Sequence, residues 1–281
     1  MRCLVTGGRG FVGQHLMAAL SERGHEAISY DLVDGQDVLD PESLKKAVLG
    51  AKAVFHLAGI LGTEETFSNI RRCFDVNVMG TLNLLDICTD HDVPLIVLSL
   101  TSKWLSPYMV SKQAANALCQ TYAAAYCTPV SVVRGLNAYG PGQHWGAVRK
   151  VVPTFIVAAL QGDPLRIYGD GNQIVDLIYV SDVAEIMVRL WESGKWGLLL
   201  DAGTGVPTRV IDLAQMVIEM CGSQSTIEHE AMRLGEAKGA VALADPTDAL
   251  RELGYYPQVG LQQGLGETIE WYRERWREAE R

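Results

Sequence analysis

The residues CLVTGGRGFVGQHL (Cys3–Leu16) decide the fold, because an apolar run passes through three spaced glycines into an amphipathic stretch. Gly7, Gly10 and Gly13 have the spacing G-x-x-G-x-x-G. Glycine at such positions permits a tight turn, lets the backbone approach a pyrophosphate and allows the helix to pack on the strand. The helix N-terminus then offers free N–H groups to the anion. The stretch therefore predicts a strand, a phosphate-binding turn and a helix, which together form a dinucleotide site.

An acidic residue ends the next predicted strand. Asp31 follows the apolar run that begins at Glu26. A carboxylate in this position accepts hydrogen bonds from a ribose 2′-hydroxyl and repels a 2′-phosphate. The glycine turn and Asp31 together predict NAD rather than NADP as the cofactor.

Apolar runs and amphipathic stretches alternate through the first two-thirds of the chain. The runs are rich in Val, Ile and Leu, which is typical of strands buried on both faces. The predicted strands are Arg2–Thr6, Glu26–Asp31, Ala53–Leu57, Leu95–Leu100, Val130–Arg134 and Trp196–Asp201, and the predicted helices are Phe11–Arg23, Pro41–Leu49, Phe67–His91, Tyr108–Tyr126 and Ser181–Trp191. Such alternation predicts an α/β fold, a Rossmann doubly wound parallel sheet with helices on both faces.

Two domains are predicted from the change in texture after Asn137, where turn-rich stretches such as AYGPGQ replace the alternation. Residues 1–137 plus 177–203 are expected to form the NAD-binding Rossmann domain. Residues 138–176 plus 204–281 are expected to form a smaller, discontinuous C-terminal lobe that binds the substrate.

Composition and charge exclude several classes of function. The chain has 281 residues and a formal charge of −9, so we expect no nucleic-acid partner. No basic-then-apolar leader precedes the first strand and no apolar run reaches the roughly 18 residues of a membrane span, so we expect a cytoplasmic protein with no membrane partner. The six cysteines show neither C-x-x-C nor metal-ligand spacing, and most lie in apolar segments. This pattern is typical of buried reduced thiols and predicts no metal site.

The stretch TSKWLSPYMVSK (Thr101–Lys112) carries the predicted acid–base residues. Tyr108 and Lys112 are four apart and share one face of a predicted helix. The ammonium favours the phenolate form of the tyrosine, which makes the phenol usable as an acid or base at neutral pH. The pair is a weak signal by itself, and it gains weight from the glycine turn in the same chain.

A series of short motifs covers nearly the whole chain. In order, they are TGGRGFVG, QDVLD, HLAG, NVMGT, PYMVSK, RGLNAYGPGQ, YGDGNQIVD, YVSDVAE and LADPTDALRELGYYP. In these motifs the chain resembles the extended short-chain dehydrogenase/reductase superfamily, and within it the NAD-dependent nucleotide-sugar epimerase/dehydratase family.

The resemblance implies a role for each matching residue and a homodimer as the assembly. It implies Thr101, Tyr108 and Lys112 as the catalytic residues. It implies that the substrate contacts Thr101, Tyr108, Asn137 and Arg233. It implies that NAD contacts Gly7, Gly10, Phe11, Val12, Gly13, Asp31, Asp37, Val38, Leu57, Ala58, Gly59, Asn77, Ser99, Tyr108 and Lys112.

The implied activity is the epimerisation of a nucleoside-diphosphate sugar through a transient keto intermediate, with Tyr108 as acid and base. Dehydratases of the family have two acids after the strand-end threonine, whereas Ser102 and Lys103 follow Thr101 here. This disfavours that branch. Three alternatives stay open: an NAD-dependent dehydrogenase or reductase, a dehydratase of another sugar or small alcohol, and a non-catalytic dinucleotide-binding sensor.

Two departures from the family pattern concern the substrate pocket. Only six residues separate Thr101 from Tyr108, where relatives have about twenty or more. Val175 replaces an arginine that contacts the nucleotide diphosphate in relatives, although Arg233 resembles another such anchor. A nucleotide sugar remains the expected substrate, with one anchor missing.

Overall fold

The computed structural model describes residues 1–100, 105–146 and 148–279, with side chains as far as residue 275. A parallel sheet of six strands has the order β2-β1-β3-β4-β5-β8. Its strands are β1 (Arg2–Thr6), β2 (Glu26–Tyr30), β3 (Ala53–His56), β4 (Leu95–Ser99), β5 (Val130–Gly135) and β8 (Leu199–Ala202). In this sheet Leu4 of β1 lies between Ile28 of β2 and Val54 of β3. The predicted α/β class and Rossmann sheet are confirmed.

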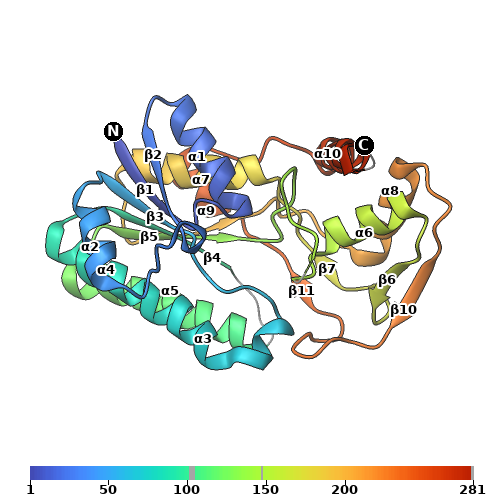
Figure 1. The fold of residues 1–281 in the computed structure, drawn as a ribbon, viewed down its shortest axis with the longest axis horizontal. Coiled ribbons are helices and arrows are strands. Elements are labelled where there is room, and N and C mark those ends of the chain that lie inside the picture. Colours follow the sequence, from blue (N-terminus) through green and yellow to red (C-terminus); the bar gives the residue numbers. More distant parts are fainter. Residues whose placement is uncertain (101–104, 147, 280–281) are drawn as a thin grey trace.

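Helices cover both faces of this sheet (Figure 1). One face carries α1 (Phe11–Glu22) and α7 (Val180–Ser193), and the other carries α2 (Pro41–Leu49), α4 (Gly80–His91) and α5 (Pro107–Tyr126). Adjacent strand residues point to opposite faces. Val5 therefore packs in the core beneath α1 and α7, whereas Leu4 packs in the core beneath α2 and α4. Both faces are apolar, which explains why the strand sequences do not alternate.

The predicted helix Phe67–His91 is interrupted in the structure. It is divided into a 3₁₀ turn (Glu65–Asn69), α3 (Ile70–Phe74), a π turn (Asp75–Met79) and α4. The Asn69 side chain accepts a hydrogen bond from the Arg72 N–H and starts α3. Isolated π turns inside helices frequently occur at functional sites, and this one carries Asn77.

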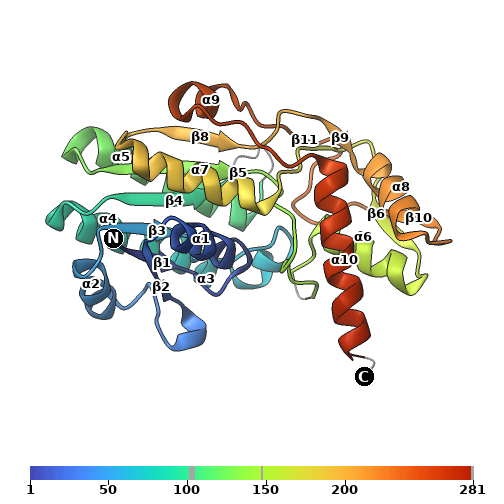
Figure 2. The ribbon, with the colours of Figure 1, turned by 90° about the horizontal axis from the view of Figure 1, so that it is seen from above.

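A second group of elements lies at one end of the six-stranded sheet (Figure 2). It comprises α6 (Val151–Gln161), β6 (Leu165–Tyr168), β7 (Ile174–Val175), β9 (Thr208–Arg209), α8 (Val210–Cys221), β10 (Ile227–Glu230), β11 (Val241–Ala242) and α10 (Leu261–Ala279). These elements share their own apolar core, which includes Phe155, Leu213 and Leu265. β6 pairs with β10, and β7 lies between β11 and β9.

One helix from the later part of the chain packs on the larger sheet. α9 (Thr247–Leu253) contacts α7 and β8. The Asp182 carboxylate, at the start of α7, accepts hydrogen bonds from the Tyr255 hydroxyl at 2.5 Å and the Gln258 N–H at 2.9 Å. The range 204–281, expected to form the smaller lobe, therefore includes a segment that belongs to the Rossmann layer by its contacts.

Candidate active site

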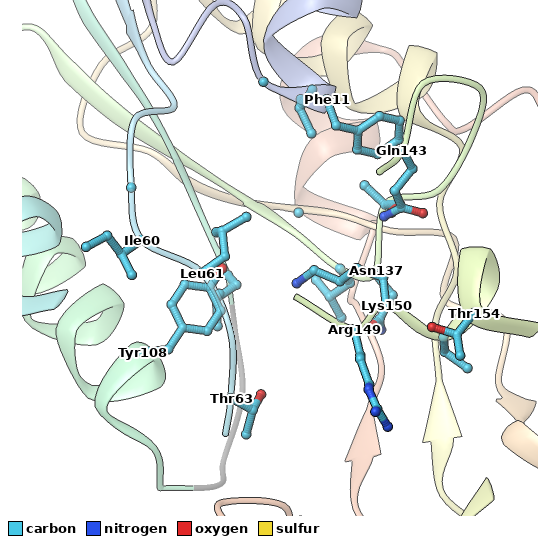
Figure 3. A pocket seen from close by; sticks show the side chains of 18 of the residues that line it. Phe11, Ile60, Leu61, Thr63, Tyr108, Asn137, Gln143, Arg149, Lys150 and Thr154 are labelled. Carbon is cyan, nitrogen blue, oxygen red and sulfur yellow. The ribbon is translucent and has the colours of Figure 1, made fainter. Parts of the chain in front are cut away.

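A cleft of about 1050 Å³ lies at the carboxyl ends of the sheet strands. The loops after β1, β2 and β3 line one wall, and residues of α6, β6 and β7 line the other. Figure 3 shows Tyr108 on one side of the cleft and Arg149 and Lys150 on the other. Ligands of open parallel sheets bind at this end of the strands. The cleft is therefore the candidate active site.

The structure gathers nearly all the predicted site residues around this one cleft. Every residue expected to contact NAD lines it except Asn77. Asn137 and Arg233, the expected substrate contacts, also line it. Thr101 lies outside the described residues. The contacts of these residues with NAD and substrate stay predictions.

The glycine turn has the close backbone packing that a dinucleotide site needs. Gly7 has φ +73°, in the left-handed region, and a Cβ there would lie 2.8 Å from the Ala58 nitrogen. A Cβ on Gly13 would lie 2.2 Å from the Gly7 carbonyl oxygen. Both neighbours are backbone atoms, so neither clash is relieved by a rotamer change. The turn and the N-terminus of α1 thus fit the pyrophosphate of NAD.

Asp31 is held beside this turn at the end of β2. One carboxylate oxygen accepts the Arg9 N–H at 2.9 Å and the other accepts the Val33 N–H at 3.1 Å. The Arg9 guanidinium pairs instead with Asp34, at 2.9 and 3.0 Å. A carboxylate oxygen accepts two hydrogen bonds, so Asp31 keeps capacity for the hydroxyls of a ribose.

We expect Asp31→Ser to weaken NAD binding about tenfold and to strengthen NADP binding, because the variant loses a charged acceptor and its repulsion of a 2′-phosphate. Fluorescence titration with both cofactors measures the change in preference. Asp90→Ser, at an exposed position of α4, is the matched control. An unchanged NAD-to-NADP ratio in Asp31→Ser would show that Asp31 does not select the cofactor.

Tyr108 and Lys112 lie on the first turns of α5, which begins at Pro107 directly after its N-cap residue, Ser106. The Ser106 hydroxyl accepts the Met109 N–H at 3.2 Å and caps the helix. Tyr108 and Lys112 are both buried and both line the cleft. The Lys112 ammonium donates to the Leu98 carbonyl at 2.9 Å, which ties it to the end of β4.

The protonation of this pair differs from the sequence-based expectation. Burial raises the pKa of the Tyr108 phenol, and burial lowers the pKa of the Lys112 ammonium to about 8. Desolvation disfavours the charged form of each group. The lysine therefore does not by itself produce a phenolate. The nicotinamide of NAD, when bound, supplies a further positive charge that favours the phenolate.

Asn77 lies behind the residues that line the cleft, and its contact with NAD stays a prediction. Its side chain is buried, and its amide oxygen accepts the Ile60 N–H at 2.8 Å. Its amide nitrogen donates to the Ile60 carbonyl at 3.0 Å and to the Ser111 hydroxyl at 2.9 Å. Asn77 thus joins the loop after β3 to the helix of Tyr108. Asn77 itself lies in the π turn Asp75–Met79.

His56 is a buried structural residue at the end of β3. Its Nδ1 lies 2.7 Å from the Thr6 hydroxyl and its Nε2 lies 3.0 Å from the Thr81 hydroxyl. Burial, with a smaller effect of the Lys112 charge, lowers the pKa of His56 to about 3. The imidazole is therefore neutral in the folded protein at neutral pH.

Because the pKa of His56 is lower in the folded than in the unfolded chain, the unfolded chain binds more protons between about pH 3 and pH 6.5. The free energy of unfolding should fall as the pH falls through this window, by up to about 1.4 kcal/mol per pH unit for this residue. His56→Gln should reduce that slope, as measured by urea unfolding between pH 4.5 and 7. His91→Gln, at an exposed position, is the control. Equal slopes in His56→Gln and the unmodified protein would contradict the assignment.

Several polar side chains that line the cleft have no partner among the described residues. Among the described residues, the cleft-lining side chains with a buried, unpaired nitrogen or oxygen are Ser99, Gln143, Thr154, Gln173 and Arg233. Buried polar groups are normally paired, so a ligand is expected to supply their partners. Sequence reasoning had identified only Ser99 and Arg233. Gln143 and Gln173 lie within quoted motifs, whereas Thr154 lies in an apolar helix that gives no such signal.

Asn137 and Arg233, the two expected substrate contacts outside α5 and the loop before it, both line the cleft but have different partners. The Asn137 side-chain amide donates to the Asp176 carbonyl at 3.0 Å. The Asn137 backbone is in the left-handed conformation, with φ 38°. Arg233 pairs with Glu236, and its guanidinium lies 4.8 Å from the centre of the Tyr168 ring. Arg149 and Lys150, which were missed from the sequence, also line this part of the cleft, as does Tyr168.

The described residues contain neither a metal-ligand cluster nor a membrane-spanning helix. Three or more His, Cys, Asp or Glu side chains are nowhere grouped so that they could hold a metal ion. Nor does any described helix have the length and apolar character needed to cross a membrane.

Comparison with known proteins gives relatives along the whole chain. The chain is 31% identical to a UDP-N-acetyl-alpha-D-glucosaminuronate decarboxylase of Bacillus cytotoxicus, and the alignment covers 97% of this chain and 98% of the relative. The chain is 28% identical to a UDP-glucose 4-epimerase of Mycolicibacterium smegmatis, and the alignment covers 97% of this chain and 99% of the relative. A solved UDP-glucose 4-epimerase of Thermotoga maritima with UDP-glucose has a TM-score of 0.92 at 27% identity, over 98% of this chain and 100% of that one.

The family model for the NAD dependent epimerase/dehydratase family matches residues 3–198. These residues include the glycine turn, Asp31 and the Tyr108–Lys112 pair. The match also covers most of the wall that carries Asn137 and Tyr168. This chain therefore belongs to the NAD dependent epimerase/dehydratase family, in the extended short-chain dehydrogenase/reductase superfamily, and NAD is its cofactor.

Proposed function

We propose that the protein is an NAD-dependent epimerase of a nucleoside-diphosphate sugar. One observation carries the proposal: a single cleft joins the dinucleotide turn, the Tyr108–Lys112 pair and the arginine-bearing wall of the smaller lobe. Tyr108 faces Arg149 and Lys150 across this cleft (Figure 3). A sugar attached to an anionic diphosphate matches that order of groups, with its diphosphate at the cations and its ring at the tyrosine.

The proposed chemistry divides between the cofactor and the protein. NAD, when bound, supplies the hydride acceptor. Tyr108 takes the proton of a sugar hydroxyl and returns a proton when the carbonyl is reduced again. Lys112, tied to β4 through Leu98, keeps its ammonium beside the cleft and orients the ribose of NAD. Reduction of the transient keto sugar on its other face inverts one carbon, and NAD is regenerated in each cycle.

A decarboxylase of a nucleotide uronic acid is the second candidate. The 31% identical relative from Bacillus cytotoxicus carries that activity in its name. Both reactions begin with oxidation of a sugar hydroxyl, so the same tyrosine and cofactor serve either one. The dehydratase branch is disfavoured by Ser102 and Lys103 after Thr101. The homodimer and the cytoplasmic location stay predictions.

The test is product analysis by NMR after incubation of the NAD-loaded protein with UDP-glucose, UDP-N-acetylglucosamine and UDP-glucuronate in separate reactions. Formation of an epimer without net NADH supports the proposal. Loss of carbon dioxide from UDP-glucuronate assigns the decarboxylase. Net NADH accumulation assigns a dehydrogenase, and turnover of none of the three by the NAD-loaded protein contradicts an epimerase of these sugars.

A further inference from the structure

A threonine from the loop after β3 contacts the helix that carries Tyr108. Thr66 lies in the 3₁₀ turn Glu65–Asn69 and is buried, with 2% of its surface exposed. Its hydroxyl oxygen accepts the Tyr108 backbone N–H at 3.3 Å, and the hydroxyl donates to the Gly62 carbonyl at 2.8 Å. Figure 3 shows Tyr108 and Thr63, from the same loop, on one side of the cleft. We propose that Thr66 is a positioning residue that holds Tyr108 in place for proton transfer; this rests on the proposed function.

The start of α5 explains why Tyr108 takes a partner from another element. The first N–H groups of a helix have no acceptor within that helix. Pro107 has no N–H, and the Ser106 hydroxyl accepts the Met109 N–H. The Tyr108 N–H lies between these two positions and is bonded by Thr66. Without the threonine hydroxyl, this acceptor would be lost at the residue that carries the proposed acid and base.

The Tyr108 carbonyl is tied to the same region of the chain through a second path. The Ser111 hydroxyl donates to it at 2.8 Å and accepts the Asn77 amide at 2.9 Å. The Asn77 side chain also hydrogen-bonds the backbone of Ile60, in the loop after β3. The backbone N–H and carbonyl of Tyr108 are therefore both referred to one segment, directly by Thr66 and indirectly by Ser111. Thr66 makes the shorter of the two connections.

The neighbours of Thr66 on the same turn meet the opposite wall of the cleft. The Glu65 carboxylate accepts the Arg149 N–H at 3.2 Å, from the segment before α6. A Cβ on Gly235, between β10 and β11, would lie 2.8 Å from a ring carbon of Phe67, so this segment packs closely on the turn. The turn thus contacts the smaller lobe on both sides of Thr66. It places the tyrosine relative to both walls of the cleft.

The experiment compares Thr66→Val and Thr66→Ser in steady-state kinetics. The substrate is whichever of UDP-glucose, UDP-N-acetylglucosamine and UDP-glucuronate the unmodified protein turns over. Valine replaces the hydroxyl by a methyl group, so kcat should fall about tenfold, because a small displacement of a reacting group costs rate. KM and the Kd of NAD should change less than about twofold, since the cleft-lining side chains remain. Serine keeps the hydroxyl and should restore most of kcat.

Two matched controls separate positioning from stability. Thr268→Val in α10 also removes a buried hydroxyl, which donates to the Gly264 carbonyl at 2.6 Å, far from the cleft residues. It should lower the melting temperature, as Thr66→Val does, and keep full kcat. Thr121→Val, at an exposed position of α5, should change neither quantity.

The outcomes distinguish failure of the positioning role from failure of the proposed function. An unmodified protein that epimerises none of the sugars contradicts the proposed function, and the positioning role with it. Epimerisation with an undiminished kcat in Thr66→Val contradicts the positioning role alone. So does a loss of kcat in Thr66→Ser as large as in Thr66→Val, a matching loss in Thr268→Val, or a rise in KM as large as the fall in kcat.

Discussion

Tyr108→Phe should reduce turnover of the nucleotide sugar by about a hundredfold to ten-thousandfold, the range that general acid–base catalysis contributes. The substitution removes one hydroxyl from a buried side chain and leaves the ring in place. The cap at Ser106 and the Lys112–Leu98 hydrogen bond do not involve that hydroxyl. The variant should therefore fold and bind NAD, and should fail only in the transfer of the substrate proton.

The matched control is Tyr126→Phe, at an exposed position on the last turn of the same helix. It should retain full turnover. NAD binding is measured separately by fluorescence titration, so that a loss of cofactor is not mistaken for a loss of chemistry. Undiminished turnover in Tyr108→Phe, with the control also active, would exclude Tyr108 as the acid and base.

Gly13→Ala should remove the NAD site and destabilise the fold. The added Cβ would lie 2.2 Å from the Gly7 carbonyl oxygen and 2.8 Å from the Gly8 Cα. Relief requires a shift of α1 relative to the turn, because both contacts are with backbone. Overpacking of this kind costs about 1–3 kcal/mol. We expect a lower melting temperature and no further rise in it when NAD is added, measured by thermal unfolding with and without NAD.

Gly266→Ala in α10 is the control for this second prediction. A Cβ there would meet only Met220 Cε, at 3.7 Å, which is ordinary van der Waals contact. Alanine is favoured over glycine inside a helix by about 0.5–1 kcal/mol. This variant should keep its stabilisation by NAD. A comparable stabilisation by NAD in Gly13→Ala would mean that the turn tolerates a side chain and does not hold the pyrophosphate.

Much of the fold could be predicted because its signals are local. Predicted Arg2–Thr6 and Pro41–Leu49 agree residue for residue with β1 and α2. The other sheet strands agree within a few residues, since each is a short apolar run bounded by turns. The interruption in Phe67–His91 was missed, because the sequence has one continuous helical periodicity there, whereas the Asn77 side chain in the π turn hydrogen-bonds the Ile60 backbone and the Ser111 hydroxyl. Those partners lie far from Asn77 in the sequence.

The candidate site was predictable to different degrees at its two ends. The cofactor end follows from closely spaced motifs, and every residue named there lines the cleft except Asn77. The substrate end depends on residues that no local pattern connects. Arg149, Tyr168 and Arg233 meet only because β6, α6 and the segment after β10 pack together.

The sequence by itself determined the family, the Rossmann sheet, the preference for NAD and the Tyr108–Lys112 pair. These features depend on spacing within one turn or one strand–helix unit, and the chain carries that information locally. The tertiary structure decided the hydrogen-bond partners of Asn77, the docking of α9 on the large sheet and the meeting of the arginines around Tyr168. It also showed that burial raises the pKa of Tyr108, an effect that the spacing of Tyr108 and Lys112 does not reveal. Contacts between distant segments and the loss of water around charged groups exist only once the chain has folded.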